Sequence, residues 1–195
     1  MKILVIHGLN SSPEKIEWLS EPLRKYGEVY VPKVDEEIME TVEKYSSFNC
    51  DLVAGHSRGG ASALILGSKK VIPVIAVSPP ADRLLQLHYL STFPSGTPQH
   101  RNYEYLSSLG EEYLRNTSPI NYVKGLKDVL LIHGTRDDIV QQRQSEILCE
   151  KIRESGGRCQ LQIIDMKHSP MRSQYKEIDN IISEWLNSLN TSHFH

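Results

Sequence analysis

The sequence of 195 residues contains only three cysteines, Cys50, Cys149 and Cys159, and it contains no long apolar run. Because the cysteines are odd in number, widely spaced and without a C-x-x-C pair, they argue against a zinc site or a dithiol redox centre, and we expect buried free thiols. The apolar run at residues 2–6 is too short for a secretory signal, and no run approaches the length of a membrane span. These absences predict a cytoplasmic protein without a membrane segment.

The chain also lacks an excess of charge of either sign. Lys and Arg number 22 and Asp and Glu number 24, so the formal net charge is -2. A chain of this charge has no electrostatic reason to bind nucleic acid or an anionic membrane surface. We therefore expect a small neutral or mildly charged molecule as the partner.

Short apolar runs alternate with segments that have the apolar spacing of helices. Short runs bounded by turn residues are typical of strands buried on both faces, and their alternation with helices indicates a parallel sheet. The sequence thus predicts an α/β fold, a three-layer αβα sandwich with a mostly parallel sheet of about six strands. The expected strands lie at residues 2–6, 29–31, 52–54, 72–77, 129–132 and 161–164.

The first expected helix has a marked beginning and end. Ser11 and Ser12 are suitable N-cap residues, Pro13 suits the first helical position, Glu14 suits a capping box, and Gly27 ends the helix. The other expected helices lie at residues 36–45, 58–66, 142–154 and 174–189.

The segment from residue 78 to 127 interrupts the alternation. It has no clear strand and carries several prolines and aromatic residues. An excursion of this length inside a compact domain is usually functional. We expect a single domain over residues 1–190, with a small, partly helical cap inserted at about 79–124, and a frayed tail at 191–195; the alternative is a structural crossover.

The motif G-x-S-x-G occurs as Gly55-His56-Ser57-Arg58-Gly59, directly after an apolar run and before a helical segment. In this setting the motif predicts a sharp turn that exposes the Ser57 hydroxyl above the carboxyl end of the sheet. The flanking glycines are expected because the strand and the helix pass too close for a Cβ.

A serine nucleophile needs a base and a group that orients the base. His168 follows the last expected strand, and Asp137 follows the strand before it, so both residues lie at the same sheet edge as Ser57. Asp138 is the alternative acid, or it caps the helix that follows. Of the other histidines, His56 is expected to point elsewhere, and His7 and His133 to shape loop ends.

An oxyanion formed during acyl transfer needs two hydrogen-bond donors. The backbone amide of Arg58, at the start of its helix, is one candidate, and the amide of Leu9, in the turn after the first strand, is the other. The Arg58 side chain either binds an acidic group of the substrate or is solvated at the surface.

The four segments VIHGLNSSP, GHSRGG, LLIHGTRDDIV and MKHSP resemble, in this order, the motifs of a small α/β-hydrolase. The region around the third segment is similar to esterases of the dienelactone-hydrolase and prolyl-oligopeptidase type. The resemblance implies an α/β-hydrolase fold that lacks the first two strands, a Ser-His-Asp triad, no metal and no organic cofactor.

Together these observations predict a serine hydrolase that cleaves small carboxylic esters, with Ser57, His168 and Asp137 as the catalytic triad and the amides of Leu9 and Arg58 as the oxyanion hole. The alternatives are a peptidase, a thioesterase or a C–C bond hydrolase with the same triad. A non-catalytic binding module that keeps a relic triad is a further alternative, since a fold does not determine function.

Overall fold

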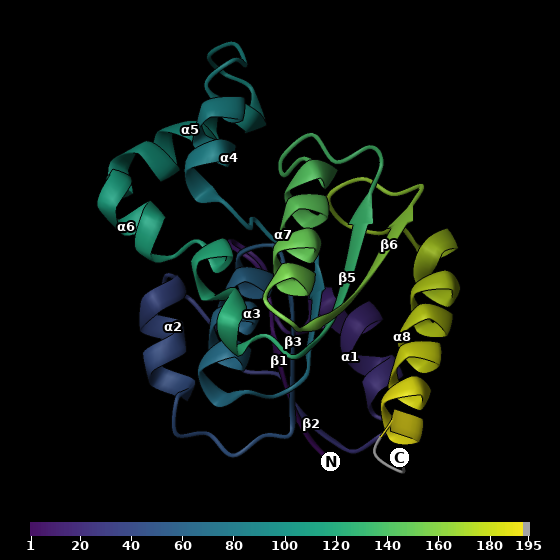
Figure 1. The fold of residues 1–195 in the computed structure, drawn as a ribbon. Helices are drawn as coiled ribbons and strands as arrows, with labels where there is room; N and C mark the ends of the chain where they lie inside the picture. Colours follow the sequence, from purple (N-terminus) through teal and green to yellow (C-terminus); the bar gives the residue numbers. More distant parts are fainter. Residues whose placement is uncertain (193–195) are drawn as a thin grey trace.

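The computed structural model describes residues 1–192, with side chains described to residue 190. Its centre is a six-stranded sheet in which every neighbouring pair of strands is parallel. The strand order is β2-β1-β3-β4-β5-β6, so the chain runs outward in both directions from β1 and β3 (Figure 1). The bounds are β1 (Lys2–Ile6), β2 (Glu28–Tyr30), β3 (Leu52–His56), β4 (Val74–Val77), β5 (Asp128–Gly134) and β6 (Arg158–Ile164).

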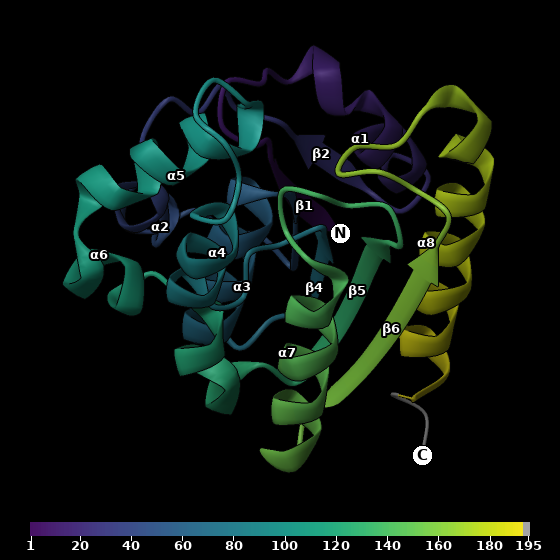
Figure 2. The same cartoon turned by 90° about the horizontal axis from the view of Figure 1, so that it is seen from above.

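Helices cover both faces of the sheet, which confirms the predicted three-layer α/β fold (Figure 2). Alternate residues of β1 show the reason: Leu4 and Ile6 pack into one core cluster, and Ile3 and Val5 pack into the other. On the first face lie α2 (Ile38–Tyr45), α3 (Arg58–Lys70) and α7 (Gln142–Glu154), and on the second lie α1 (Glu17–Leu23) and α8 (Arg172–Ser192).

Between β4 and β5 the chain leaves the sheet and forms a group of short helices above its carboxyl end (Figure 1). They are α4 (Arg83–Leu90), α5 (Pro98–Leu109) and α6 (Glu111–Asn116); the 3-10 helix η2 (Pro119–Gly125) follows them and packs beside α3 and α7 on the first face. Leu90, Leu106 and Leu114 form a small apolar cluster inside this group. We call residues 79–124 the helical insertion.

The predicted start of the first helix is wrong. The chain first forms a 3-10 turn, η1 (Glu14–Ile16), and no side chain caps η1 or α1. Pro13 is the N-cap residue of η1. The helix ends at Leu23, and Gly27 lies beyond it, next to the Met1 carbonyl where a Cβ would clash.

The expectation of three free thiols is also wrong. Cys149 on α7 and Cys159 on β6 form a disulfide, because α7 packs beside β6 and brings the two Cα atoms to 5.4 Å. Cys50 is free and buried. Since disulfides are rare in most cytosolic proteins, the cytoplasmic location stays a prediction.

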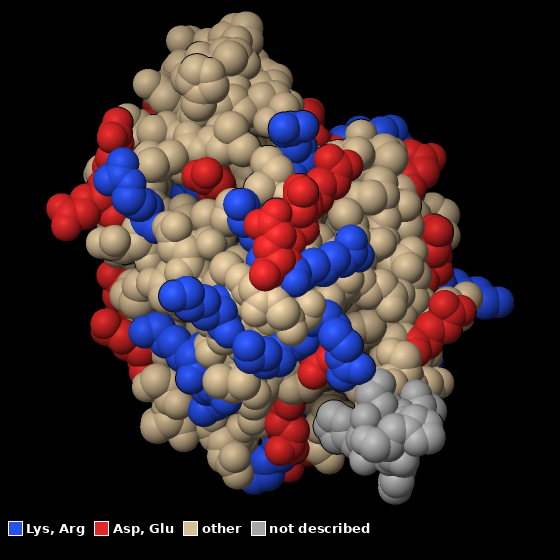
Figure 3. Space-filling view, in the orientation of Figure 1, with Lys and Arg blue, Asp and Glu red and all other residues tan. Residues whose placement is uncertain are grey.

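The last helix begins two residues before the predicted start and continues through Ser192. The rest of the predicted frayed tail, residues 193–195, lies outside the described residues. Within residues 1–192, none of the helices is long and apolar enough to cross a membrane. On the face of the molecule that Figure 3 shows, both acidic and basic side chains lie on the surface of the body. The small net charge leads one to expect this mixture.

Candidate active site

Ser57 occupies a strained turn between β3 and α3. Its φ of 56° and ψ of -125° are rare for a residue with a side chain. The flanking glycines permit the turn: a Cβ on Gly55 would lie 2.1 Å from the Gly59 carbonyl oxygen, and a Cβ on Gly59 would lie 2.2 Å from the Ile6 carbonyl oxygen. The glycines are therefore required by the close passage of β1, β3 and α3, as the motif predicts.

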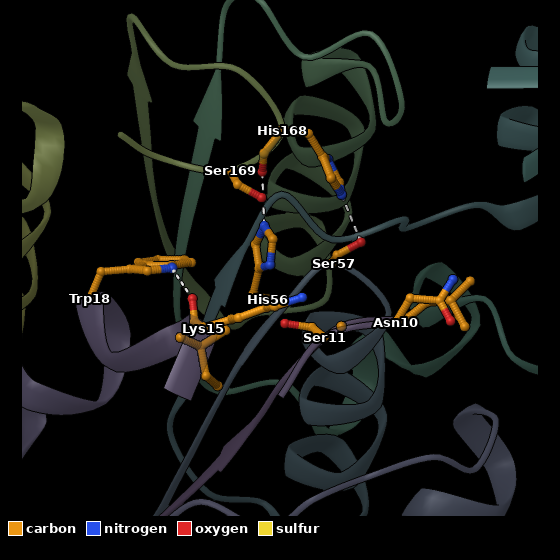
Figure 4. A pocket seen from close by; sticks show the side chains of 11 residues that line it. Asn10, Ser11, Lys15, Trp18, His56, Ser57, His168 and Ser169 are labelled. Atoms are coloured by element: carbon orange, nitrogen blue, oxygen red, sulfur yellow. Dashed lines mark hydrogen bonds between the residues drawn. The ribbon is translucent and has the colours of Figure 1, made fainter. Parts of the chain in front are cut away.

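Three loops at the carboxyl edge of the sheet bring the predicted side chains together. His168, after β6, has its Nε2 atom 2.8 Å from Ser57 Oγ (Figure 4). Its Nδ1 atom lies 2.8 Å from Asp137 Oδ2, in the loop after β5. Ser57, His168 and Asp137 thus form one continuous chain of hydrogen bonds. Such a chain can transfer a proton away from the serine hydroxyl while the carboxylate orients the imidazole.

The Asp137 side chain is fully buried and its carboxylate has four donors. Oδ1 accepts from the amides of Ile139 and Val140, and Oδ2 accepts from His168 and from His133 Nε2 at 3.1 Å. Burial alone would raise the pKa of Asp137. The hydrogen bonds from His133 and His168 outweigh burial and hold this pKa well below its usual value, so the carboxylate stays ionised.

His133 is a contributor that the sequence reasoning missed. Its Nε2 atom also lies 2.8 Å from the Val140 carbonyl oxygen, and its Nδ1 atom lies 2.7 Å from Ser145 Oγ. Since Nε2 faces two acceptor oxygens, it is the nitrogen that donates. His133 therefore shapes the loop end, as expected, and also holds the carboxylate. The sequence feature that could have indicated this contact is the position of His133, four residues before Asp137.

Asp138 lies outside this group. Its Oδ2 atom accepts from Gln99 Nε2 on α5, and Gln141, which has no side-chain cap bond, is the N-cap residue of α7. The alternative that Asp138 caps α7 is therefore wrong. Asp138 also has no hydrogen bond to His168 among the described residues, so the geometry favours Asp137 as the acid.

The expectation that His56 points elsewhere is wrong. His56 Nε2 donates to the His168 carbonyl oxygen at 2.8 Å, and the rings of His56 and Trp18 meet edge to face (Figure 4). Burial, followed by the neighbouring His168, lowers the pKa of His56 to about 3, so its ring is neutral. The side chain thus holds the His168 loop against β3. His7, as expected, shapes a loop end, since its Nε2 atom accepts from the Val34 amide.

The turn after β1 lies directly against Ser57. A Cβ placed on Gly8 would be 3.2 Å from Ser57 Cβ. In residues 1–192 neither the Leu9 amide nor the Arg58 amide has a protein acceptor. Both amides are therefore available to a ligand beside Ser57, which is what an oxyanion hole requires.

Two cavities meet at Ser57. The first, which we call the histidine-side cavity, has a volume of about 360 Å³. Figure 4 shows its polar lining. The second, the arginine-side cavity, has about 40 Å³ and lies toward the helical insertion. Leu9 and Ser57 line both. The histidine-side cavity adds Asn10, Lys15, Trp18, His168 and Ser169, and the arginine-side cavity adds Arg58, Arg83, Gln86, Asn102 and Tyr105.

Arg58 is buried, so of the two alternatives for its side chain the solvated arginine is wrong. Its Nη1 donates to the Tyr105 hydroxyl at 3.2 Å, and that hydroxyl donates to Glu37 Oε1 at 3.0 Å. Glu37 in turn forms a two-armed ion pair with Arg83. Burial raises the pKa of Glu37, but the Arg83 guanidinium outweighs it and lowers this pKa, so Glu37 is ionised.

No metal ligand cluster occurs in the described part of the chain, since no three His, Cys, Asp or Glu side chains there could hold an ion. Serine, histidine and aspartate, which lie together at Ser57, are residue types that nucleophilic catalysis uses.

Residues 40–189 match the model of the prolyl oligopeptidase family. The chain belongs to this family. The match runs from within α2 to within α8, and therefore includes Ser57, Asp137 and His168. As a family member the chain is a hydrolase of the α/β-hydrolase type, which confirms the resemblance seen in the sequence.

Several solved structures share the fold of this protein, although their sequence identity to it is low. Est1E from Butyrivibrio proteoclasticus is 17% identical, with a TM-score of 0.71 over 96% of this chain and 87% of that chain. The Paleococcus ferrophilus monoacylglycerol lipase is 18% identical, with a TM-score of 0.69 over 96% and 94%. The meta-cleavage product hydrolase CumD from Pseudomonas fluorescens IP01 is 16% identical, with a TM-score of 0.69 over 97% and 91%. No curated protein matches the sequence.

Proposed function

We propose that the protein is a serine hydrolase that cleaves small carboxylic esters. The observation that carries this proposal is the hydrogen-bond chain from Ser57 Oγ through His168 to Asp137, at 2.8 Å for each link. The strained backbone of Ser57 and the two unpaired amides beside it support the same function.

In the proposed mechanism Ser57 Oγ attacks the ester carbonyl carbon while His168 Nε2 takes the hydroxyl proton. The amides of Leu9 and Arg58 hold the resulting oxyanion. The carbon–oxygen bond to the alcohol then breaks, and the alcohol leaves with the proton from His168. Water, activated by His168, hydrolyses the acyl-enzyme and restores Ser57. Asp137 stays ionised and orients His168 throughout.

The helical insertion acts in this proposal as a small cap. Its residues Gln86, Asn102 and Tyr105 line the arginine-side cavity next to Ser57. The cap thus bounds the space open to the substrate on one side, and the substrate is a small molecule.

The family match makes a peptidase the second candidate, since the family is that of prolyl oligopeptidase. Thioesters would need the same triad. The structural neighbours include a monoacylglycerol lipase and a meta-cleavage product hydrolase, so an acylglycerol ester and a meta-cleavage product are further substrate classes to test.

The test is hydrolysis of p-nitrophenyl esters from acetate to decanoate, with wild type and Ser57→Ala. We expect turnover with wild type and a loss of at least about 10³-fold with Ser57→Ala. Ser20→Ala is the matched control, because Ser20 is buried on α1 and its hydroxyl has no hydrogen-bond partner among residues 1–192. Equal turnover by Ser57→Ala and wild type contradicts the proposal.

A fluorophosphonate probe separates the other candidates, since labelling requires an activated serine. Labelling of Ser57 without ester turnover favours a peptide or thioester substrate. Absence of both labelling and turnover favours a binding module with a relic triad.

A further inference from the structure

The two cavities beside Ser57 have different positions relative to His168. The proposed function, on which this inference rests, requires His168 to return its proton to the departing alcohol oxygen. His168 and Ser169 line the histidine-side cavity, whereas neither lines the arginine-side cavity. The alcohol therefore leaves through the histidine-side cavity, and the acyl chain lies in the arginine-side cavity.

The arginine-side cavity limits the acyl chain to a few atoms. Its volume of about 40 Å³ is about one ninth of the 360 Å³ of the histidine-side cavity, so it is the narrower of the two. A carboxylate or a short alkyl group fits such a space, and a long acyl chain does not.

The charges around the arginine-side cavity are unequal. Two guanidinium groups, those of Arg58 and Arg83, face one carboxylate, that of Glu37, and both oxygens of Glu37 are paired with Arg83. Arg58 has only the neutral Tyr105 hydroxyl as a hydrogen-bond partner among the described residues. A cation that is more than nine-tenths buried and lacks a counter-ion is unfavourable unless a ligand supplies one.

Arg83, which also lines this cavity, is the arginine with which Glu37 pairs. Its Nη1 atom donates to Glu37 and Thr117, and its Nη2 atom donates to Glu37. The wall of the cavity thus holds unused N–H donors of Arg58, beside the proposed nucleophile Ser57.

We propose that the acyl group of the substrate ends in a carboxylate held by Arg58, so that the substrates are monoesters of short dicarboxylic acids of three or four carbons. Ser57 forms a bond to the ester carbonyl carbon, and the bond from this carbon to the alcohol oxygen breaks. Water then releases the dicarboxylate. The remote carboxylate is unchanged by the reaction and only positions the acyl chain.

The test compares monoethyl succinate with ethyl 4-methylpentanoate, in which an uncharged isopropyl group replaces the carboxylate at nearly the same shape. Hydrolysis is followed by proton release, with Ser57→Ala as the blank. We expect kcat/KM for monoethyl succinate to exceed that for the uncharged ester at least tenfold, and the advantage to fall with increasing salt. An equal or lower value for monoethyl succinate overturns the inference.

Variants then distinguish a binding role of Arg58 from a purely structural one. Arg58→Met should remove the preference for the charged ester, and Arg58→Lys should restore part of it. Tyr105→Phe removes the hydroxyl that links Arg58 to Glu37 but keeps the positive charge, so it should keep the preference. The ratio to compare is kcat/KM for monoethyl succinate divided by kcat/KM for ethyl 4-methylpentanoate. If this ratio is the same in Arg58→Met as in Tyr105→Phe, the role of Arg58 is structural and the inference is wrong.

Two further measurements keep the outcome decisive. If Arg58→Met does not fold, inhibition of wild type by succinate and by 4-methylpentanoate replaces it, and weaker inhibition by succinate overturns the inference. Fluorophosphonate labelling of Ser57 separates the two levels: labelling without the charged-ester preference overturns only this inference, and absence of labelling and of turnover overturns the proposed function as well.

Discussion

His133 Nε2 lies 3.1 Å from Asp137 Oδ2, and both side chains are fully buried. A second donor, His168 Nδ1, lies 2.8 Å from the same carboxylate oxygen, Asp137 Oδ2. One oxygen thus accepts from two imidazoles, of which only His168 reaches Ser57. His133 is therefore a positioning residue that keeps Asp137 ionised and fixed.

Replacing His133 tests this role. His133→Phe removes a donor from Asp137, so we expect the pKa of Asp137 to rise and kcat for p-nitrophenyl butyrate to fall about tenfold, which corresponds to ~1.4 kcal/mol of transition-state stabilisation. His133→Gln keeps a donor and should retain more activity. The acidic limb of the pH–rate profile should shift to higher pH in His133→Phe; an unshifted limb would show that His133 supports only the loop.

The neighbouring aspartates provide a matched pair. Asp137→Asn removes the acceptor that holds His168 in the required tautomer, and we expect kcat to fall about 10³- to 10⁴-fold. Asp138→Asn alters only the contact with Gln99 on α5 and should change kcat less than about threefold. Steady-state kinetics on both variants checks this assignment, which is reversed if Asp138→Asn is the more damaged enzyme.

His56 makes the native state sensitive to acid. Its pKa is about 3 in the native state and 6.5 as the ordinary value, so between these values the unfolded chain binds a proton that the native chain does not. The contribution to stability is complete above pH 6.5 and is lost as the pH falls, at about 1.4 kcal/mol for each pH unit within this window.

Denaturant unfolding of wild type and His56→Gln at pH 7, 6, 5 and 4.5 measures this contribution. Glutamine keeps an N–H for the His168 carbonyl and does not titrate, so the free energy of unfolding of this variant should depend less steeply on pH. Identical slopes in the two proteins would mean that His56 is not the group responsible.

The disulfide between Cys149 and Cys159 joins α7 to β6 across a sequence separation of 10 residues. Cys149→Ser or Cys159→Ser should lower the free energy of unfolding by about 2–4 kcal/mol. A reductant should lower the melting temperature of wild type but not of either variant. Thiol titration in denaturant should find one free thiol, Cys50, before reduction and three after it; three thiols before reduction would exclude the bond in the isolated protein.

Much of the fold follows from local sequence. The apolar runs of β1 and β3, the helical spacing of 142–154 and the G-x-S-x-G turn depend on residues close together in the chain, so their prediction needed no tertiary contacts. The meeting of Ser57, Asp137 and His168 could also be anticipated, because parallel strands place all their carboxyl ends at one edge of the sheet. The wrong prediction for the start of the first helix concerns only a single helical turn, where the chain forms the 3-10 turn η1 before α1.

By itself the sequence determined the α/β architecture and the three side chains at the sheet edge, through hydrophobic periodicity and strand order. The tertiary structure alone decided what surrounds them. The second imidazole on Asp137, the His56 contact, the Arg58–Tyr105–Glu37–Arg83 chain and the disulfide all join segments that are distant in sequence or fixed by loop conformation. Such contacts depend on side-chain packing between elements, which neither periodicity nor motif spacing encodes.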